Sequence, residues 1–268
     1  FIGNEISMKE KAANEIRLII TDLAFSGNNS KEKNDATVMM CMSLNWKNFR
    51  FERHIDYIET RPGGGADKLV LRIKELFHDY QADYLVMDNR SGGETIYDYL
   101  SMTTEHPQRG VQWNPSGFTV ANEIDYQVAS DGKIQELRNR TVDPNAIPCI
   151  IPILATSEFN SNCWRSLKKQ IGVNNIKFLI PSNEKQEIME YTGEYYELTS
   201  EEFADAMLPY MQTEALIQEC VNLSAEYRNG LIKLTEPRSG WKDRAVVLAY
   251  GNLIADKIEN KYNRLYQK

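Results

Sequence analysis

The stretch ADKLVLRIKELFHDYQADYLVMD, residues 66–88, decides the fold class of this 268-residue chain. Its apolar residues first recur at the spacing of one helix face, at Leu69, Ile73, Leu76, Phe77 and Tyr80. The run Asp83–Met87 (DYLVM) is too short for a helix and predicts a strand, which Asp88 closes. Together with the strand predicted just before this stretch, the helix and the second strand imply a right-handed parallel crossover.

The residues before this stretch predict an antiparallel part of the same sheet. Three runs, at Arg17–Leu23, Ala36–Leu44 and Phe49–Glu59, are rich in residues that strands prefer. Short connections between consecutive strands predict an antiparallel meander. A meander combined with a parallel crossover makes a mixed sheet, so the predicted fold class is α/β, a mixed β-sheet flanked by helices.

The second half of the chain is expected to add helices and further strands. Residues 105–146 show no sustained period and carry several prolines and glycines, so we interpret them as an irregular insertion with one helix near Glu123–Ser130. Pro209 is expected to split one long helix into two, Ser200–Leu208 and a second that ends at about residue 228. The remaining predicted elements are strands at Ile147–Ala155, Ile176–Ile180 and Leu231–Leu234, and helices at Glu94–Leu100, Asn162–Ile171 and Trp241–Tyr262.

The composition is that of an ordinary globular protein, with 42% hydrophobic and 26% charged residues. It excludes disordered and collagen-like chains, and no apolar run approaches the roughly 20 residues that span a bilayer. The net charge of −7 arises between residues 184 and 205, because 30 basic residues face 30 acidic ones in the rest of the chain. We interpret this acidic stretch as a solvated face, and the mean acidity does not by itself exclude nucleic-acid binding.

Several kinds of catalytic or metal site have no candidate in the sequence. The four cysteines lie far apart and the three histidines fall at no zinc-ligand spacing, which excludes zinc and disulfide scaffolds. The chain has neither a GxxxxGKS/T phosphate-binding loop nor a GxSxG elbow, so it predicts no ATP site and no side-chain nucleophile. Carboxylates remain as the candidate catalytic groups.

Three aspartates stand where a sheet edge and a helix face would bring them together. Asp22 ends the first predicted strand and Asp88 ends the strand after the crossover. Strand ends of an α/β sheet meet at the edge where ligands bind. Asp243 lies on the inward face of the last helix, because apolar residues follow it at helical spacing. A carboxylate on such a face is unfavourable unless it is paired or binds a metal.

Each aspartate also has a simpler interpretation. A strand-end acid is often a turn residue, and an acid in a first helical turn complements the helix dipole. Carboxylates gathered at one edge, however, repel each other unless they share a cation, and oxygen ligands without histidine or cysteine favour Mg²⁺ or Mn²⁺. Two such ions about 4 Å apart can hydrolyse a phosphodiester. Together the three aspartates therefore predict metal-dependent phosphodiester hydrolysis.

Four segments, in this order, resemble the nuclease domain of the large terminase subunit of tailed bacteriophages. They are Arg17–Leu23 with Asp22, Asn34–Val38 (NDATV), Leu85–Gly93 (LVMDNRSGG) and Lys242–Tyr250 (KDRAVVLAY). Because they run from one end of the chain to the other, the resemblance covers most of it. It implies a ribonuclease H-like fold.

The resemblance also implies roles for individual residues. In that family the matching acids bind the catalytic metals, which makes Asp22, Asp88 and Asp243 the expected ligands of two divalent cations, Mg²⁺ or Mn²⁺. Asp35 matches an acid that often lies close to the metals, and a turn residue fits it almost as well. The family's other half is an N-terminal motor ATPase. Residues 1–15 are therefore interpreted as a polar helical lead-in from that part, and residues 16–268 as the nuclease domain.

The expected function is that of an endonuclease that cleaves concatemeric viral double-stranded DNA during genome packaging. The resemblance implies the host cell cytoplasm as its location, outside the mature virion and any membrane, with the portal protein and the small terminase subunit as partners. Candidate contacts to the phosphate backbone are Lys31, Lys33, Arg90, Arg165, Lys168, Lys169, Lys242 and Arg244. Two alternatives stay open: another ribonuclease H-like nuclease of the resolvase or transposase type, and a non-catalytic docking module that binds a partner through the acidic stretch.

Overall fold

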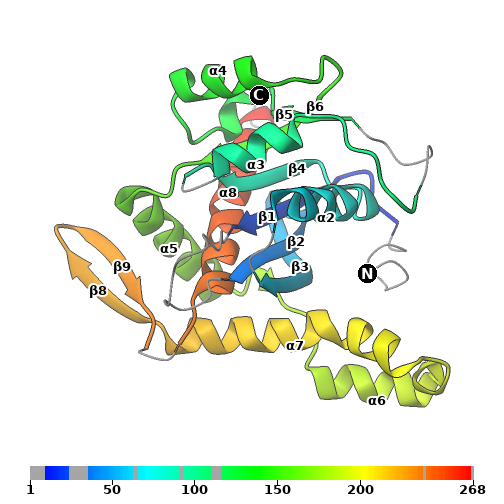
Figure 1. Ribbon diagram of the computed structural model, residues 1–268. Helices are drawn as coiled ribbons and strands as arrows, with labels where there is room; N and C mark the ends of the chain where they lie inside the picture. Colours follow the sequence, from blue (N-terminus) through cyan, green and yellow to red (C-terminus); the bar gives the residue numbers. More distant parts are fainter. Residues whose placement is uncertain are drawn as a thin grey trace.

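The computed structural model describes residues 10–23, 36–62, 65–90, 93–109, 116–237 and 240–266. They form a seven-stranded sheet in the order β5-β6-β4-β1-β2-β3-β7 and a separate two-stranded sheet, β8-β9 (Figure 1). The predicted α/β class, a mixed sheet flanked by helices, is confirmed. Within the described residues every helix is too short or too polar to cross a bilayer.

The predicted meander is present at the centre of the sheet. β1 (Glu15–Asp22) pairs antiparallel with β2 (Ala36–Lys47), and β2 pairs antiparallel with β3 (Arg50–Pro62). Only Asn48 and Phe49 join β2 to β3, and both have positive φ angles, 52° and 60°. Two such residues give the turn whose twist matches the flanking strands, so the hairpin closes without a longer loop.

The helical lead-in expected before β1 is wrong in its described part. Residues 10–14 form no helix, and β1 already begins at Glu15. The reason is a tertiary contact, because the ammonium group of Lys11 donates to a carboxylate oxygen of Asp83 at 2.6 Å and to the Gln81 carbonyl at 3.1 Å. These bonds tie the segment to the residues that precede β4.

The predicted parallel crossover is confirmed. α2 (Ala66–Asp79) leads into β4 (Tyr84–Asp88), which pairs parallel with β1. Further parallel strands extend the sheet on both sides. β6 (Ile147–Ile153) pairs with β4, β5 (Phe118–Val120) pairs with β6, and β7 (Ile176–Lys177) pairs with β3.

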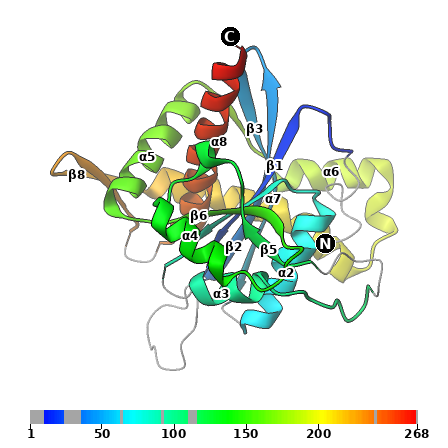
Figure 2. The same ribbon diagram turned by 90° about the horizontal axis from the view of Figure 1, so that it is seen from above.

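Helices cover both faces of the sheet, as Figure 2 shows. On one face α5 (Ser157–Gly172) and α8 (Asp243–Tyr266) pack over the side chains of alternate strand residues, while α2 and α3 (Gly93–Leu100) pack over the other face. Gly251 allows α8 to approach the sheet closely. A Cβ atom at that position would lie 2.8 Å from the side chain of Ile20 on β1.

Residues 105–146 are more regular than the sequence suggested. They contribute β5 to the edge of the sheet, then the 3-10 turn η2 (Ile124–Tyr126) and the helix α4 (Asp131–Arg140). The expected helix therefore lies later in the chain than predicted. Only two side chains of α4, Ile134 and Leu137, are identified as buried, and so few apolar residues leave no hydrophobic period to detect.

The predicted break at Pro209 is wrong, because α7 (Ser200–Asn222) runs through it. The proline removes one helical hydrogen bond, and burial of Met207, Tyr210 and Leu216 against neighbouring elements outweighs that loss. The helix also ends earlier than predicted, since residues up to 228 form β8 (Ser224–Arg228), which pairs with β9 (Leu231–Thr235).

The acidic stretch forms a helical projection that the sequence analysis did not predict in detail. It comprises α6 (Ser182–Thr192), the 3-10 turn η3 (Glu194–Tyr196) and the first turns of α7, which lie below the sheet in Figure 1. The interpretation as a solvated face is confirmed, because all the acidic residues of the stretch are exposed: Glu184, Glu187, Glu190, Glu194, Glu197, Glu201, Glu202 and Asp205.

Candidate functional site

The structure brings Asp22 and Asp88 together at the carboxyl edge of the sheet. Thr21 of β1 and Met87 of β4 are the last paired residues of the two parallel strands. Asp22 and Asp88 directly follow them, one on each strand. Because neighbouring strands lie about 4.8 Å apart, the two aspartates stand side by side.

Both carboxylates belong to the face of the sheet that α8 covers. Ile20 and Val86 lie in the core on that face, and side chains two residues apart along a strand point to the same side. The charges of both carboxylates act on the hydroxyl group of Tyr250, on α8. Burial raises the pKa of its hydroxyl, the negative charges of Asp22 and Asp88 raise it further, and Arg90 lowers it. The two carboxylates therefore act on one buried hydroxyl group.

The turn after β4 holds Asp88 in place. The backbone N–H of Arg90 donates to one Asp88 carboxylate oxygen at 3.2 Å, and the guanidinium lies 3.5 Å from the other. Gly93 begins α3 so close to the strand that a Cβ atom there would collide with the carbonyl oxygen of Asp88. The glycine therefore allows a tight strand-to-helix turn, and Arg90 places an exposed positive charge beside the carboxylate.

Asp243 lies in the first turn of α8. The first helical hydrogen bond runs from the N–H of Val246 to the carbonyl of Lys242, so Asp243 is the first residue inside the helix. It shares a helix face with Tyr250, seven residues or about 10 Å further along the axis. Within the described ranges, no three histidine, cysteine, aspartate or glutamate side chains form a group that could hold a metal ion. Asp22 and Asp88 end adjacent parallel strands, and Asp243 lies in the first turn of the helix that packs over the same face of the sheet.

The chemistry of this pair fits a hard divalent cation. Both candidate ligands are carboxylates, which suit Mg²⁺ or Mn²⁺, and two neighbouring negative charges repel without a cation between them. The helices α3 and α5 begin just after β4 and β6, and Asp88 is paired with Ile153 at the end of β6. The amino ends of both helices thus lie at this edge, where their partial positive charge favours an anion.

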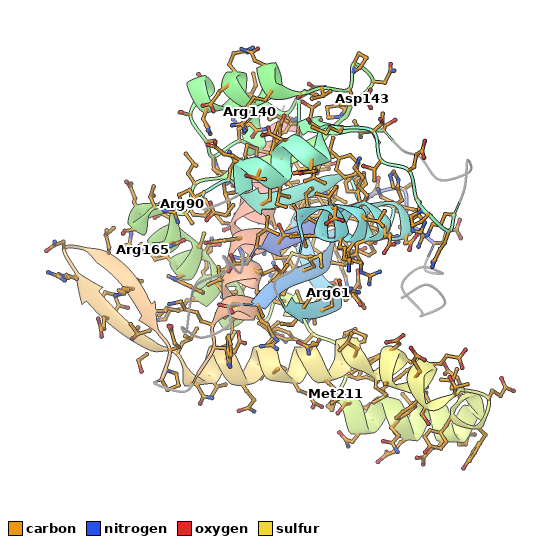
Figure 3. All side chains as sticks on the ribbon, in the orientation of Figure 1. Arg61, Arg90, Arg140, Asp143, Arg165 and Met211 are labelled. Atoms are coloured by element: carbon orange, nitrogen blue, oxygen red, sulfur yellow. The ribbon has the colours of Figure 1, made fainter. Side chains whose placement is uncertain are left out.

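The predicted DNA contacts differ in the partners that their side chains have within the protein. Arg165 of α5 donates to the carbonyl of Gly230 in the β8-β9 turn, and Lys242 pairs with Glu236 at 2.7 Å. The Arg244 guanidinium is bound by Glu219 and Gln212 of α7. Figure 3 shows Arg90 and Arg165 on the same side of the molecule, and Lys168 and Lys169 are exposed on α5. The remaining DNA-contact candidates, Lys31 and Lys33, lie outside the described residues, as does Asp35, the further candidate metal ligand.

Sequence reasoning missed three features near this site. In the sequence, Tyr250 is one of several residues at helical spacing from Asp243. Only the packing of α8 against the sheet exposes its hydroxyl group to the charges of Asp22 and Asp88. Asn89 is 2% exposed, and no partner for its side-chain amide is found among the described residues. The β8-β9 hairpin had a detectable signal, because Asn229-Gly230 between two strand-like runs is typical of a two-residue turn.

The sequence matches no protein-family model and no curated protein. In structure the chain is similar to nuclease domains of phage large terminase subunits. One is the large terminase nuclease from thermophilic phage G20c, with 12% identity, a TM-score of 0.44, and 90% of this chain and 88% of that chain covered. Another is a mutant nuclease domain of the large terminase subunit gp2 of bacterial virus Sf6 with manganese and beta-thujaplicinol, with 10% identity, a TM-score of 0.44, and 90% and 87% covered. These identities are too low to transfer residue roles from one chain to the other.

Proposed function

We propose that this chain is a metal-dependent endonuclease that cleaves concatemeric viral double-stranded DNA during genome packaging. The observation that carries the proposal is the pair Asp22 and Asp88, side by side at the ends of adjacent parallel strands. The resemblance of four sequence segments to phage terminases adds the substrate and the setting: the host cell cytoplasm, with the portal protein and the small terminase subunit as partners.

Asp22 and Asp88 would hold the divalent cations, with Asp243 as the third ligand from the facing helix. Two bound Mg²⁺ or Mn²⁺ ions would supply an activated water and neutralise the leaving 3′ oxygen. A tyrosine hydroxyl is protonated at neutral pH, and burial together with the charges of Asp22 and Asp88 raises the pKa of Tyr250 further. That hydroxyl can donate a hydrogen bond at the site throughout the neutral range.

Exposed positive side chains would bind the DNA backbone, and one of them, Arg90, contacts a proposed ligand. Arg90 stands beside Asp88 with about half of its side chain exposed, at 47%. Lys168 and Lys169 of α5 and Lys233 of the hairpin are also exposed. Lysine and arginine contacts of this kind neutralise phosphates without reading bases, so the proposed cleavage has little sequence preference.

Plasmid DNA incubated with the purified chain is expected to be cut in Mn²⁺ or Mg²⁺ without ATP. The physical reason is that the site consists of carboxylates, which need a cation to act on a phosphodiester. Gel electrophoresis of the plasmid at several metal concentrations measures the cutting, with EDTA as the control. Cleavage that persists in EDTA contradicts the metal mechanism, and a chain that neither binds Mn²⁺ nor cuts DNA would favour the docking module instead.

Asp243→Asn is expected to reduce the thermal stabilisation that Mn²⁺ gives the protein. Stabilisation by a ligand follows its affinity for the folded state, and the variant has one carboxylate fewer to bind the cation. The measurement is a pair of melts, with and without Mn²⁺, for the parent and the variant. If Asp243 merely complements the helix dipole, the metal-free variant instead loses about 0.3–1 kcal/mol and gains as much from Mn²⁺ as the parent.

A further inference from the structure

The amino end of α8, which carries Asp243, follows a residue whose side chain cannot accept a hydrogen bond from the helix. Lys242 occupies the N-cap position, as the hydrogen bond from Val246 to its carbonyl shows. A lysine side chain only donates hydrogen bonds, and that of Lys242 is directed to Glu236. The first backbone N–H groups of α8 therefore need an acceptor from another part of the chain.

Glu219 of α7 is that acceptor. One of its carboxylate oxygens accepts the backbone N–H of Arg244 at 3.0 Å and that of Ala245 at 3.1 Å. Its other oxygen accepts from the Arg244 guanidinium, and the residue is only 7% exposed. Hydrogen bonds with a charged partner are about twice as strong as neutral ones, and a negative charge at a helix N-terminus is favourable.

A second set of bonds fixes α7 itself. The Arg244 guanidinium donates to the side-chain oxygen of Gln212 at 2.8 Å, and the Thr60 hydroxyl of β3 donates to the same oxygen at 2.8 Å. Gln212 and Glu219 lie seven residues apart on α7, on one face of the helix. The first turn of α8 is thereby attached to α7 and, through Gln212, to the sheet.

We propose that Glu219 is a positioning residue for the site: by capping α8 it fixes the turn that carries Asp243 relative to Asp22 and Asp88. The inference rests on the proposed nuclease function. Glu219 acts through the backbone of α8 and through Arg244, and contacts neither cation nor DNA. Residues that orient a metal ligand in this way influence metal affinity without being ligands.

The test compares Glu219→Ala, Glu219→Gln and Gln218→Ala in the full chain. Glu219→Ala is expected to raise the Mn²⁺ concentration for half-maximal plasmid cutting by roughly 10-fold to 100-fold, with little change in the KM for DNA. In the metal-free protein the same variant should speed hydrogen exchange at the amides of Arg244 and Ala245. Glu219→Gln keeps one oxygen for the two backbone N–H groups but loses the charge and the acceptor for the Arg244 guanidinium, so it should fall between the parent and Glu219→Ala. Gln218→Ala, an exposed neighbour on the same helix, is the matched control.

Two outcomes would overturn the proposal. If Glu219→Ala melts earlier but keeps the parental Mn²⁺ requirement at a temperature where it is folded, the residue only stabilises the fold. If exchange at Arg244 and Ala245 is not faster in the variant, the cap itself is wrong. A parent that does not cut DNA in Mn²⁺ refutes the proposed function instead, and the exchange measurement still decides the cap.

Discussion

Asp22→Asn and Asp88→Asn are each expected to abolish DNA cutting and leave the fold intact. Each change removes one negative charge from the pair at the sheet edge and hardly alters the side-chain volume. Substitution of a residue that only orients a ligand reduces metal affinity or activity roughly 10-fold to 100-fold, so loss of a ligand should reduce cutting by at least the upper figure. Plasmid cleavage in Mn²⁺, together with a melting curve of each variant, measures the effect.

Asp131→Asn is the matched control for this experiment. Asp131 is exposed at the start of α4, so the same chemical change there should leave cutting unchanged. The metal-free forms give a second readout, because relief of repulsion between neighbouring carboxylates should leave both site variants at least as stable as the parent. If either site variant cuts DNA at a near-parental rate with an unchanged melting temperature, that aspartate is not a ligand.

Asp256→Ala is expected to lower the free energy of unfolding by about 3–5 kcal/mol, the range for breaking a buried ion pair. Asp256 of α8 lies 2.6 Å from the guanidinium of Arg53, which is fully buried in β3. Burial lowers the pKa of Arg53, and the charges of Asp256 and Glu259 raise it. Without Asp256, the buried cation keeps a single acidic neighbour among the described residues, Glu259 at 3.8 Å.

Urea unfolding of the parent and the variant measures this loss. The double variant Arg53→Met with Asp256→Ala is the control, because removal of both charges leaves no unpaired ion in the core and should restore much of the stability. A loss below about 1 kcal/mol for Asp256→Ala would mean that the pair behaves as a surface salt bridge. The expected result makes this pair a main attachment of α8 to the sheet.

The central fold and the positions of Asp22, Asp88 and Asp243, at two strand ends and a helix start, could be predicted from the sequence, because they depend on local patterns. The period of a helix and the length of a strand are visible in residues 66–88, and they correctly predicted the crossover from α2 to β4. Asp22 and Asp88 end apolar runs, so their position at strand ends follows from the runs themselves. Parallel pairing of β1 and β4 then placed them side by side.

Local sequence patterns do not show which distant segments of the chain contact each other. The sequence does not show that the Arg244 guanidinium binds Glu219, 25 residues earlier, and the phosphate contact expected of Arg244 stays a prediction. Pro209 indicated a helix break, yet burial of its neighbours keeps α7 continuous. Such outcomes depend on which helix faces meet in three dimensions, and a contact between distant residues leaves no periodic signal in the sequence.

The sequence by itself therefore determined the α/β class and the carboxylates at the strand ends. Only the tertiary structure decided that α8 packs over the face of the sheet that carries them, and that the charges of both carboxylates act on Tyr250. The physical reason is that strand and helix patterns act over a few residues. The position of α8 instead depends on residues far away in the chain, because its apolar face packs on the sheet and distant side chains bind its amino end and Asp256.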